Sequence, residues 1–312
     1  MKLSFCVTFA NQNKYIDRAI SSIIKIMGQR TDYEILVGLD NPDSEAEKLV
    51  QKFDDKTKLR TFVLHSDPRF ISLSRAAMNR AFLLKQAEGE YAMILDGDDF
   101  YIDFPNEAIH FLDTNLNYSA HAHCFKFYSE AKDLLFKSKP PYRNQEDVTL
   151  ERHLRENKYF HSNCLVFRKS LLDENAPVYC NDTALTCYLL SKGPIKFSQK
   201  EIMGYTVGIP SIYAGSSDTL KCLSSFVMLE EMMQRHTNCK KYLYKKMRKV
   251  LRNFGNKLGK DVPDEYRFQV VERNLPITKY LYESCEKNYL VRKAKLFGLR
   301  AYLSYMSKFG CK

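Results

Sequence analysis

The first hundred residues alternate between short apolar runs and stretches whose apolar residues recur every three or four positions. Buried strands are expected at 3–8 and 91–95, and further strands at 34–39 and 59–64. Helical spacing separates them, most clearly in the apolar stripe from Tyr15 to Met27. Strands that alternate with helices predict an α/β fold with a mostly parallel central sheet and helices on both faces.

The pattern changes after the first hundred residues. Strands are expected at 121–128 and 163–168, a helix at 181–192, and a polar excursion at 132–157. From about Thr219 onward the spacing is almost wholly helical. Apolar stripes there run from Leu243 to Leu258 and from Leu296 to Met306. We therefore expect an α/β domain at 1–215 and a helical region at 216–312.

Composition narrows the setting of the chain. With 312 residues, 45% of them hydrophobic, it can bury a substantial core. No run approaches 18 apolar residues, so we expect neither a transmembrane helix nor a signal peptide. The nine cysteines form no Cys-x-x-Cys pair, which favours a reducing cytoplasm and structural thiols.

The net charge of +11 is unevenly distributed. Between Lys240 and Lys260 the chain carries nine Lys or Arg and no acid. This predicts an anionic partner, with an anionic membrane surface ahead of nucleic acid because no recognised nucleic-acid reader motif accompanies the charge. The same helices are also candidates for contacts with a substrate or with another subunit.

Polar side chains gather where three of the predicted strands end. Asp96, Asp98 and Asp99 follow the 91–95 run, Asp40 follows the second strand, and Thr8 ends the first. Ligands of open parallel sheets bind at the carboxyl ends of the strands. Clustered carboxylates need a counter-charge, and Mg²⁺ or Mn²⁺ supplies it most simply. The alternative is a solvated Asp-Gly turn.

These segments together resemble the inverting family 2 glycosyltransferases with the Rossmann-like GT-A fold. The resemblance rests on 4–11, on 34–40, on Asn79, and on 87–99 with its Asp-x-Asp motif. It covers residues 3 to 103 well and weakens toward 215. It implies an enzyme that moves a sugar from a nucleotide diphosphate donor to a hydroxyl group, with Mn²⁺ or Mg²⁺ as cofactor.

The resemblance assigns roles around the metal and the nucleotide. Asp98 would bind the cation, and Asp96 would lie near the ribose or share the metal. Asp99 would either bond the acceptor or cap the next turn. Asp40 would read the nucleotide base, which favours a UDP donor because a carboxylate accepts the uracil imide N–H. Its alternative role is the N-cap of the following helix.

Further residues would complete the nucleotide pocket. Thr8 and Asn11 would line it, and Arg75 would contact base or phosphate unless it is a solvated helix charge.

The catalytic base is expected at Asp182. Residues 181–193 resemble the family segment that supplies the base, with Asn181 in place of the usual Glu. An inverting displacement requires a group to take the acceptor hydroxyl proton. Asp182 is alternatively an ordinary acid at a helix start. A later family segment matches 204–213, but Thr206 and Gly208 stand where Arg and His are usual.

Together these features predict a metal-dependent inverting glycosyltransferase. It would use a nucleotide sugar, UDP-linked by preference, and act on a glycan or lipid-linked acceptor in surface polysaccharide synthesis, on or near the cytoplasmic face of a membrane. The alternatives are an inactive nucleotide-sugar-binding scaffold and a sugar nucleotidyltransferase. A nucleotidyltransferase would be expected to carry a Gly-rich loop after the first strand, and Thr8 to Lys14 contains no glycine. The sequence names neither the sugar nor the acceptor. His121 and His123, on one face of a strand, are expected to be structural.

Overall fold

The computed structural model divides into two compact units. It describes residues 1–10, 12–53, 58–65, 72–156, 158, 160–173, 182–209, 217–235, 239–254, 258, 274–285 and 289–309. The first unit holds the described residues up to 150 and those from 158 to 209; the second holds 151–156 and those from 217 onward. The helix over 150–156 thus belongs almost entirely to the second unit.

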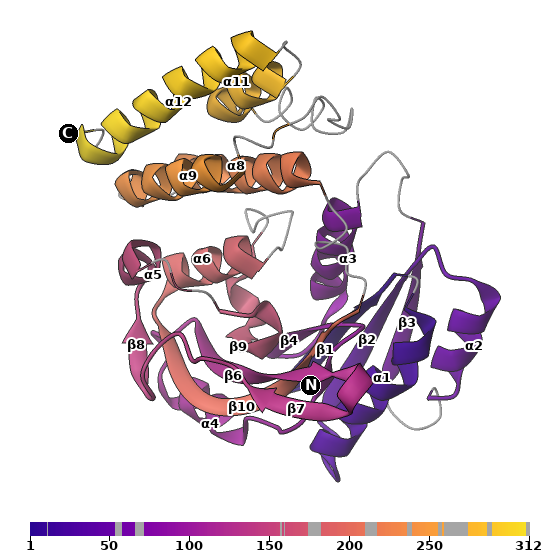
Figure 1. The fold of residues 1–312 in the computed structure, drawn as a ribbon. Helices are drawn as coiled ribbons and strands as arrows, with labels where there is room; N and C mark the ends of the chain where they lie inside the picture. Colours follow the sequence, from indigo (N-terminus) through magenta and orange to yellow (C-terminus); the bar gives the residue numbers. More distant parts are fainter. Residues whose placement is uncertain are drawn as a thin grey trace. The chain divides into compact units, whose positions relative to one another are not determined.

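Four parallel strands form the N-terminal half of the sheet in the order β3-β2-β1-β4 (Figure 1). They are β1 Leu3–Phe9, β2 Tyr33–Asp40, β3 Leu59–Leu64 and β4 Tyr91–Asp96. All seven residues of β1 and all eight of β2 are buried, which explains why both strands are mostly apolar. The pairing register sets Thr8 beside Asp96, so the ends of β1 and β4 meet.

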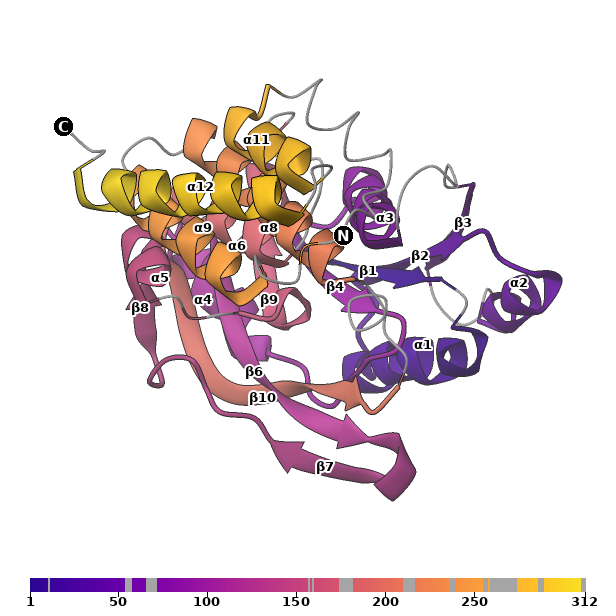
Figure 2. The same cartoon turned by 45° about the horizontal axis from the view of Figure 1, so that its top comes forward.

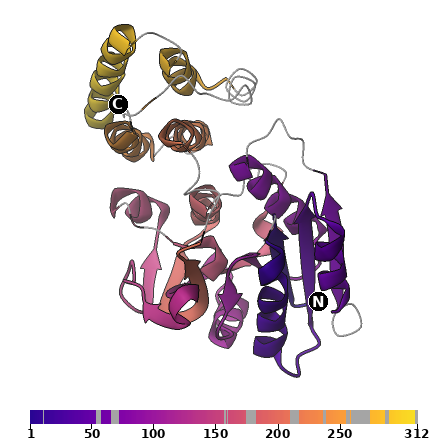
Figure 3. The ribbon, with the colours of Figure 1, turned by 45° about the vertical axis from the view of Figure 1, so that its right-hand side comes forward.

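Helices cover both faces of this sheet (Figure 3). One face buries apolar residues of α1, α2 and α4, and the other buries those of α3 and α6. The helices are α1 Asn13–Met27, α2 Ser44–Gln51, α3 Ser72–Gln86, α4 Asn106–Thr114 and α6 Asp182–Lys192. Side chains of successive strand residues point alternately to the two helical layers. The α/β fold with helices on both faces is confirmed.

The second half of the sheet is mixed in direction. From β4 the order continues β9-β6-β10-β5, with β7 paired to β6 and β8 to β10. The strands are β5 Phe100–Tyr101, β6 Ala120–Ser129, β7 Leu134–Lys137, β8 Glu146–Val148, β9 Leu165–Arg168 and β10 Ile195–Val207. Figure 2 shows the long β6 and β10 side by side as curved strands, with β7 next to β6. Single-turn 3₁₀ helices in the described residues are η1 Glu130–Lys132, η2 Ser162–Cys164 and η3 Lys169–Leu171.

Two features of this half differ from the sequence expectation. The polar stretch at 132–157 contains β7, β8 and a helix, and the sequence did not predict β10. β10 carries register shifts between Phe197 and Met203, where its pairing with β6 is irregular. A bulge of this kind breaks the alternation of buried and exposed positions by which a strand is recognised in a sequence.

The second unit is helical, as the spacing predicts. It contains α5 Leu150–Glu156, α8 Asp218–Arg235, α9 Lys240–Phe254, α11 Pro276–Cys285 and α12 Tyr289–Phe309. Its buried apolar residues include Leu243, Met247 and Leu251 of α9 and Leu296, Leu299 and Leu303 of α12. No helix in the described part of the chain combines the length and apolarity needed to cross a bilayer.

A buried acid ties two of these helices together. The Glu230 carboxylate on α8 accepts hydrogen bonds from the backbone N–H groups of Ile277 and Thr278, both at 2.7 Å, and from the Thr278 hydroxyl at 2.6 Å. A carboxylate at the first turn of α11 also meets the positive end of that helix dipole. Burial nevertheless raises the pKa of Glu230.

Candidate active site

The turn after β4 is pressed against the end of β1. The Gly97 N–H donates to the Thr8 carbonyl oxygen at 2.9 Å. A Cβ atom at position 97 would lie 2.7 Å from that oxygen and would overlap the Phe9 ring. Glycine is therefore required here by the close approach of two backbones. This contact fixes where the three acids of the 96–99 turn begin.

Two of these acids are held by neighbouring side chains. The Arg80 guanidinium forms an ion pair with one oxygen of Asp96. The Asn163 amide group donates to the other Asp96 oxygen at 3.3 Å and to Asp99 at 3.0 Å. Asp99, only 1% exposed, also accepts the backbone N–H of Thr206 at 2.9 Å. Asp99 therefore links β10 and η2 to the turn, which favours its structural role over contact with an acceptor.

Asp98 is held differently from its two neighbours. Its backbone carbonyl oxygen accepts hydrogen bonds from the Arg18 guanidinium at 2.6 Å and from the Thr206 hydroxyl. Its carboxylate has no bond from another residue of the described part of the chain. Burial, with the Asp96 charge as a second cause, raises the pKa of Asp98 to about 6. The backbone is thus fixed while the carboxylate keeps its lone pairs.

Arg18 is packed among aromatic rings. Its guanidinium lies 4.8 Å from the ring centroids of Tyr15 and Phe100 and 5.2 Å from that of Tyr128. It also donates to the Thr206 hydroxyl at 2.9 Å. Cation–π contacts restrict an arginine to one orientation. Arg18 is therefore a rigid support for the backbone of the acidic turn.

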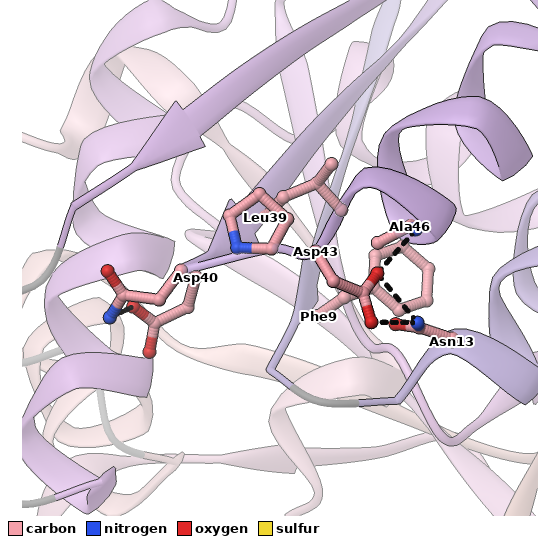
Figure 4. A pocket seen from close by; sticks show the side chains of 8 residues that line it. Phe9, Asn13, Leu39, Asp40, Asp43 and Ala46 are labelled. Carbon is pink, nitrogen blue, oxygen red and sulfur yellow. Dashed lines mark hydrogen bonds between the residues drawn. The ribbon is translucent and has the colours of Figure 1, made fainter.

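A small pocket of about 150 Å³ opens where β1 and β2 end (Figure 4). Asp40 lies at its edge, 5% exposed, with the Asn41 amide group donating to it at 3.2 Å. Asp43, on the other side, accepts the Ala46 N–H at 2.8 Å and is the N-cap of α2. The helix is thus capped by Asp43, and the capping alternative for Asp40 is wrong.

Asn13 completes this pocket wall. Its amide group donates to both Asp43 oxygens at 2.9 Å, which joins the start of α1 to the start of α2. The backbone hydrogen bond from Ala46 lowers the pKa of Asp43 most, and the bonds from Asn13 lower it further. The wall is therefore built before any ligand arrives.

The structure describes the side chains of only some of the other predicted site residues. Thr8 is buried at the end of β1, where its backbone receives Gly97. Asn11 lies outside the described residues. Arg75 lies in α3 and Asp182 begins α6, but their side chains are outside the description, so both assignments stay predictions.

Four supporting residues were missed by sequence reasoning: Arg18, Arg80, Asn163 and Thr206. Arg80 follows Asn79 in the family-like segment and was a readable signal, because it lies on the helix that precedes the acidic strand. In the sequence, Thr206 stands out only as the residue in the place of a usual arginine. Asn163 comes from a turn 64 residues after Asp99, so its role depends on tertiary contacts alone.

A metal site made only of protein ligands is not present in the described part of the chain. No group of three or more His, Cys, Asp and Glu side chains there is placed to bind a cation together. Mg²⁺ and Mn²⁺ often bind through one or two carboxylates plus substrate phosphates, so a single open carboxylate suits them. Asp98 is the acid of this turn that fits that description.

Comparison with protein families decides the class. Residues 4–175 match the model of glycosyl transferase family 2, which is more than half of the chain. The chain belongs to glycosyl transferase family 2. The family resemblance and the glycosyltransferase class predicted from the motifs are confirmed.

Relatives and solved structures agree with the family. Over 100 residues the chain is 30% identical to the poly(ribitol-phosphate) β-N-acetylglucosaminyltransferase TarS of Staphylococcus aureus strains Mu50 and MW2. This stretch covers 32% of the chain and 17% of TarS, so the chain matches less than a fifth of the length of these relatives.

Likeness in structure extends much further along the chain. S. aureus TarS 1–349 in complex with UDP-GlcNAc superposes with a TM-score of 0.68 at 18% identity, covering 99% of this chain and 92% of that one. The complex of TarS 1–349 with UDP gives 0.62 at 19% identity over the same shares. At these identities the likeness shows the fold, and the GT-A architecture is confirmed.

Proposed function

We propose that this family 2 glycosyltransferase transfers N-acetylglucosamine from UDP-N-acetylglucosamine to a hydroxyl group of a polyol-phosphate or related lipid-linked surface glycan, with inversion. TarS is named for N-acetylglucosamine transfer to poly(ribitol-phosphate), and TarS 1–349 has been solved with UDP-GlcNAc and with UDP. The observation that carries the proposal is the Asp98 carboxylate, left open by a turn whose other two acids are bonded.

Asp98 is the proposed ligand of the divalent cation, Mn²⁺ or Mg²⁺. Its backbone is anchored by Arg18 and Thr206, so the carboxylate is presented from a fixed point. When bound, the cation would stabilise the negative charge of the departing UDP. Asp96, neutralised by Arg80, would lie beside the ribose without repelling the diphosphate.

Asp40 is the proposed reader of the uracil ring. It is a buried carboxylate at the end of β2, beside the pocket formed with β1, and it can accept the imide N–H. Thr8 ends the neighbouring strand. Asn11 and Arg75 keep their proposed roles at the same nucleotide pocket.

Asp182 is the proposed general base. It begins α6, as the family pattern implies for the acid that serves this role. It would take the proton of the acceptor hydroxyl as that oxygen attacks the anomeric carbon. The bond from this carbon to the diphosphate oxygen breaks, UDP leaves, and the configuration inverts.

A panel of nucleotide sugars tests the donor assignment. With Mn²⁺ present, we expect slow hydrolysis of UDP-N-acetylglucosamine that exceeds the hydrolysis of the corresponding GDP- and dTDP-linked sugars. Preference for a GDP sugar would contradict the assignment of UDP as the donor nucleotide. Binding of UDP without hydrolysis or transfer of any donor would indicate the inactive scaffold instead.

Asp182→Asn separates binding from chemistry. If Asp182 is the base, this variant retains the UDP affinity of the unmodified protein and loses at least about a hundredfold in transfer, because the acceptor proton has no recipient. Transfer that stays within a few-fold of the unmodified rate would assign the base elsewhere.

A further inference from the structure

Helix α12 has two apolar faces. The inner face buries Leu296, Leu299 and Leu303 within the helical unit, where α12 packs against α9 and α11. The Arg248 guanidinium of α9 donates to the Ser304 hydroxyl at 3.1 Å, which fixes the pairing of these two helices. The inner face accounts for the stripe that the sequence predicts.

The outer face of α12 carries exposed aromatic rings. Phe297 is 73% exposed, Tyr305 62% and Tyr302 44%. Their spacing, with the exposed small residues Ala294, Gly298 and Ala301 between them, places them on one side of the helix. Lys293 and Lys308 lie at the two ends of this side, both exposed. We call these eight residues the outer face of α12.

Such a face differs from ordinary surface variation. Single exposed apolar residues are normal, but aligned rings on one helix mark a site of interaction. Tyr302 lies edge-on to Tyr244 of α9, with ring centroids 6.2 Å apart, but much of each ring on the outer face stays exposed.

The charge of the helical part of the chain indicates which kind of partner binds the outer face. Neither α9 nor α12 contains an Asp or Glu, and residues 210–312 hold 21 Lys or Arg against 9 Asp or Glu. Residues 1–209 hold 27 against 28, so the positive charge of the chain belongs to the helical part. A second copy would bring two such cationic surfaces together, whereas an anionic bilayer is complementary.

The packing of α9 also indicates that α12, and not α9, supplies the apolar contact with lipid. The apolar side of α9 is buried, including Leu243, Met247 and Leu251, so it is not available to lipid. Its exposed Lys241, Lys245, Lys249 and Arg252 contribute charge. The exposed rings that an interfacial helix inserts among headgroups are on α12.

We propose that the outer face of α12 docks this protein on an anionic phospholipid surface. Phe297, Tyr302 and Tyr305 enter the headgroup region, where aromatic side chains are favoured, and Lys293 and Lys308 meet lipid phosphates. This goes beyond the proposed transfer reaction and does not depend on which donor is used.

Vesicle flotation of the full chain tests the proposal. The protein is expected to float with vesicles that contain phosphatidylglycerol and phosphatidylcholine, and to remain behind with phosphatidylcholine alone. Raised salt should weaken the binding because its charge component is screened. The double variant F297S/Y305S should bind at least about tenfold more weakly, since it removes the two most exposed rings.

Matched controls separate this face from general stickiness and from misfolding. Leu116→Ser alters another exposed apolar residue, 79% exposed in the first unit, and Lys139→Glu alters an exposed charge there; both should bind vesicles like the unmodified protein. Hydrolysis of UDP-N-acetylglucosamine without lipid should be unchanged in F297S/Y305S because the two rings lie outside the unit that holds the candidate active site. An unchanged helical circular dichroism signal would show that the helical unit of this variant is folded.

Three results would overturn the proposal. One is failure of the unmodified protein to bind the anionic vesicles, and a second is full binding by F297S/Y305S. The third is a dimer in light scattering without lipid that F297S/Y305S abolishes, which would assign the outer face to a second copy. If the unmodified protein hydrolysed no donor, that result would count against the proposed function and would not affect the lipid result.

Discussion

Three acids within four residues have three different environments. Asp96 is paired with Arg80, Asp99 is buried under Asn163 and Thr206, and the Asp98 carboxylate is open. The sequence predicts the cluster and its metal, because carboxylates after a buried strand need a counter-charge. It does not predict which acid is bonded, because the partners come from α3, η2 and β10. The supporting residues depend on tertiary contacts that no local pattern records.

Asn163 is the residue whose loss should disturb the turn most. Asn163→Leu removes the amide group that joins Asp96 to Asp99 and leaves a buried carboxylate oxygen without its donor. We expect a loss of about 2–4 kcal/mol in the free energy of unfolding, measured in urea. Asn117→Leu, at an exposed position, is the control and should change the free energy of unfolding by less than about 0.5 kcal/mol. Equal effects would contradict the bridging role.

Two glycines provide a matched pair for the close approach of β1 and the acidic turn. Gly97→Ala should destabilise the fold by more than about 2 kcal/mol, because its Cβ meets the Phe9 ring and the Thr8 carbonyl. Gly298→Ala, in α12 with its nearest neighbour 3.9 Å away, should stabilise by about 0.5–1 kcal/mol. Thermal or urea unfolding measures both. A neutral Gly97→Ala would show that the turn can move away from β1.

At the scale of elements, the sequence predicts the buried parallel strands well and the irregular ones poorly. β1, β2 and β4 are buried, mostly apolar runs, so local pattern and final structure agree, and β3 at the edge of the sheet was predicted as a strand although it is only partly buried. β10 was missed because its bulge and its mixture of buried and partly exposed residues erase the alternation. β6 was predicted together with its two histidines. Elements whose regularity is set by neighbours are the ones that local patterns fail to show.

The two histidines of β6 predict a loss of stability in acid. His121 and His123 are buried and stacked with ring centroids 4.5 Å apart, and burial lowers the pKa of His121 to about 4 and that of His123 well below its usual value. Lys196 and Lys200 add repulsion. The unfolded chain takes up protons from about pH 6.5 downward while the folded chain does not. The free energy of unfolding is therefore highest above that pH. As the pH falls below it, each histidine lowers the free energy of unfolding by up to about 1.4 kcal/mol per pH unit.

Urea unfolding across this pH range measures the effect. His123→Leu should flatten the acid limb of the curve, because one of the two buried imidazoles no longer has to stay neutral. His110→Gln, at an exposed position on α4, should leave the curve unchanged. An unchanged curve for His123→Leu would mean that other groups cause the acid sensitivity.

For the whole molecule, family and charge divide along the chain. The family match ends at residue 175, and the net positive charge lies beyond 210. The sequence therefore predicts a catalytic α/β part and a cationic helical part. The sequence does not show that the apolar side of α9 is buried in packing, whereas rings of α12 stay exposed. That difference is visible only once the helices are packed.

Calorimetry with UDP and Mn²⁺ tests the central claim, that Asp98 holds the cation which meets the donor diphosphate. The unmodified protein should bind UDP more tightly with Mn²⁺ than without it, and Asp98→Asn should remove at least about tenfold of that gain. Asp17→Asn, an exposed acid on α1, should bind like the unmodified protein. If Asp98→Asn instead kept the full Mn²⁺-dependent gain in UDP affinity, the account of this site would be wrong.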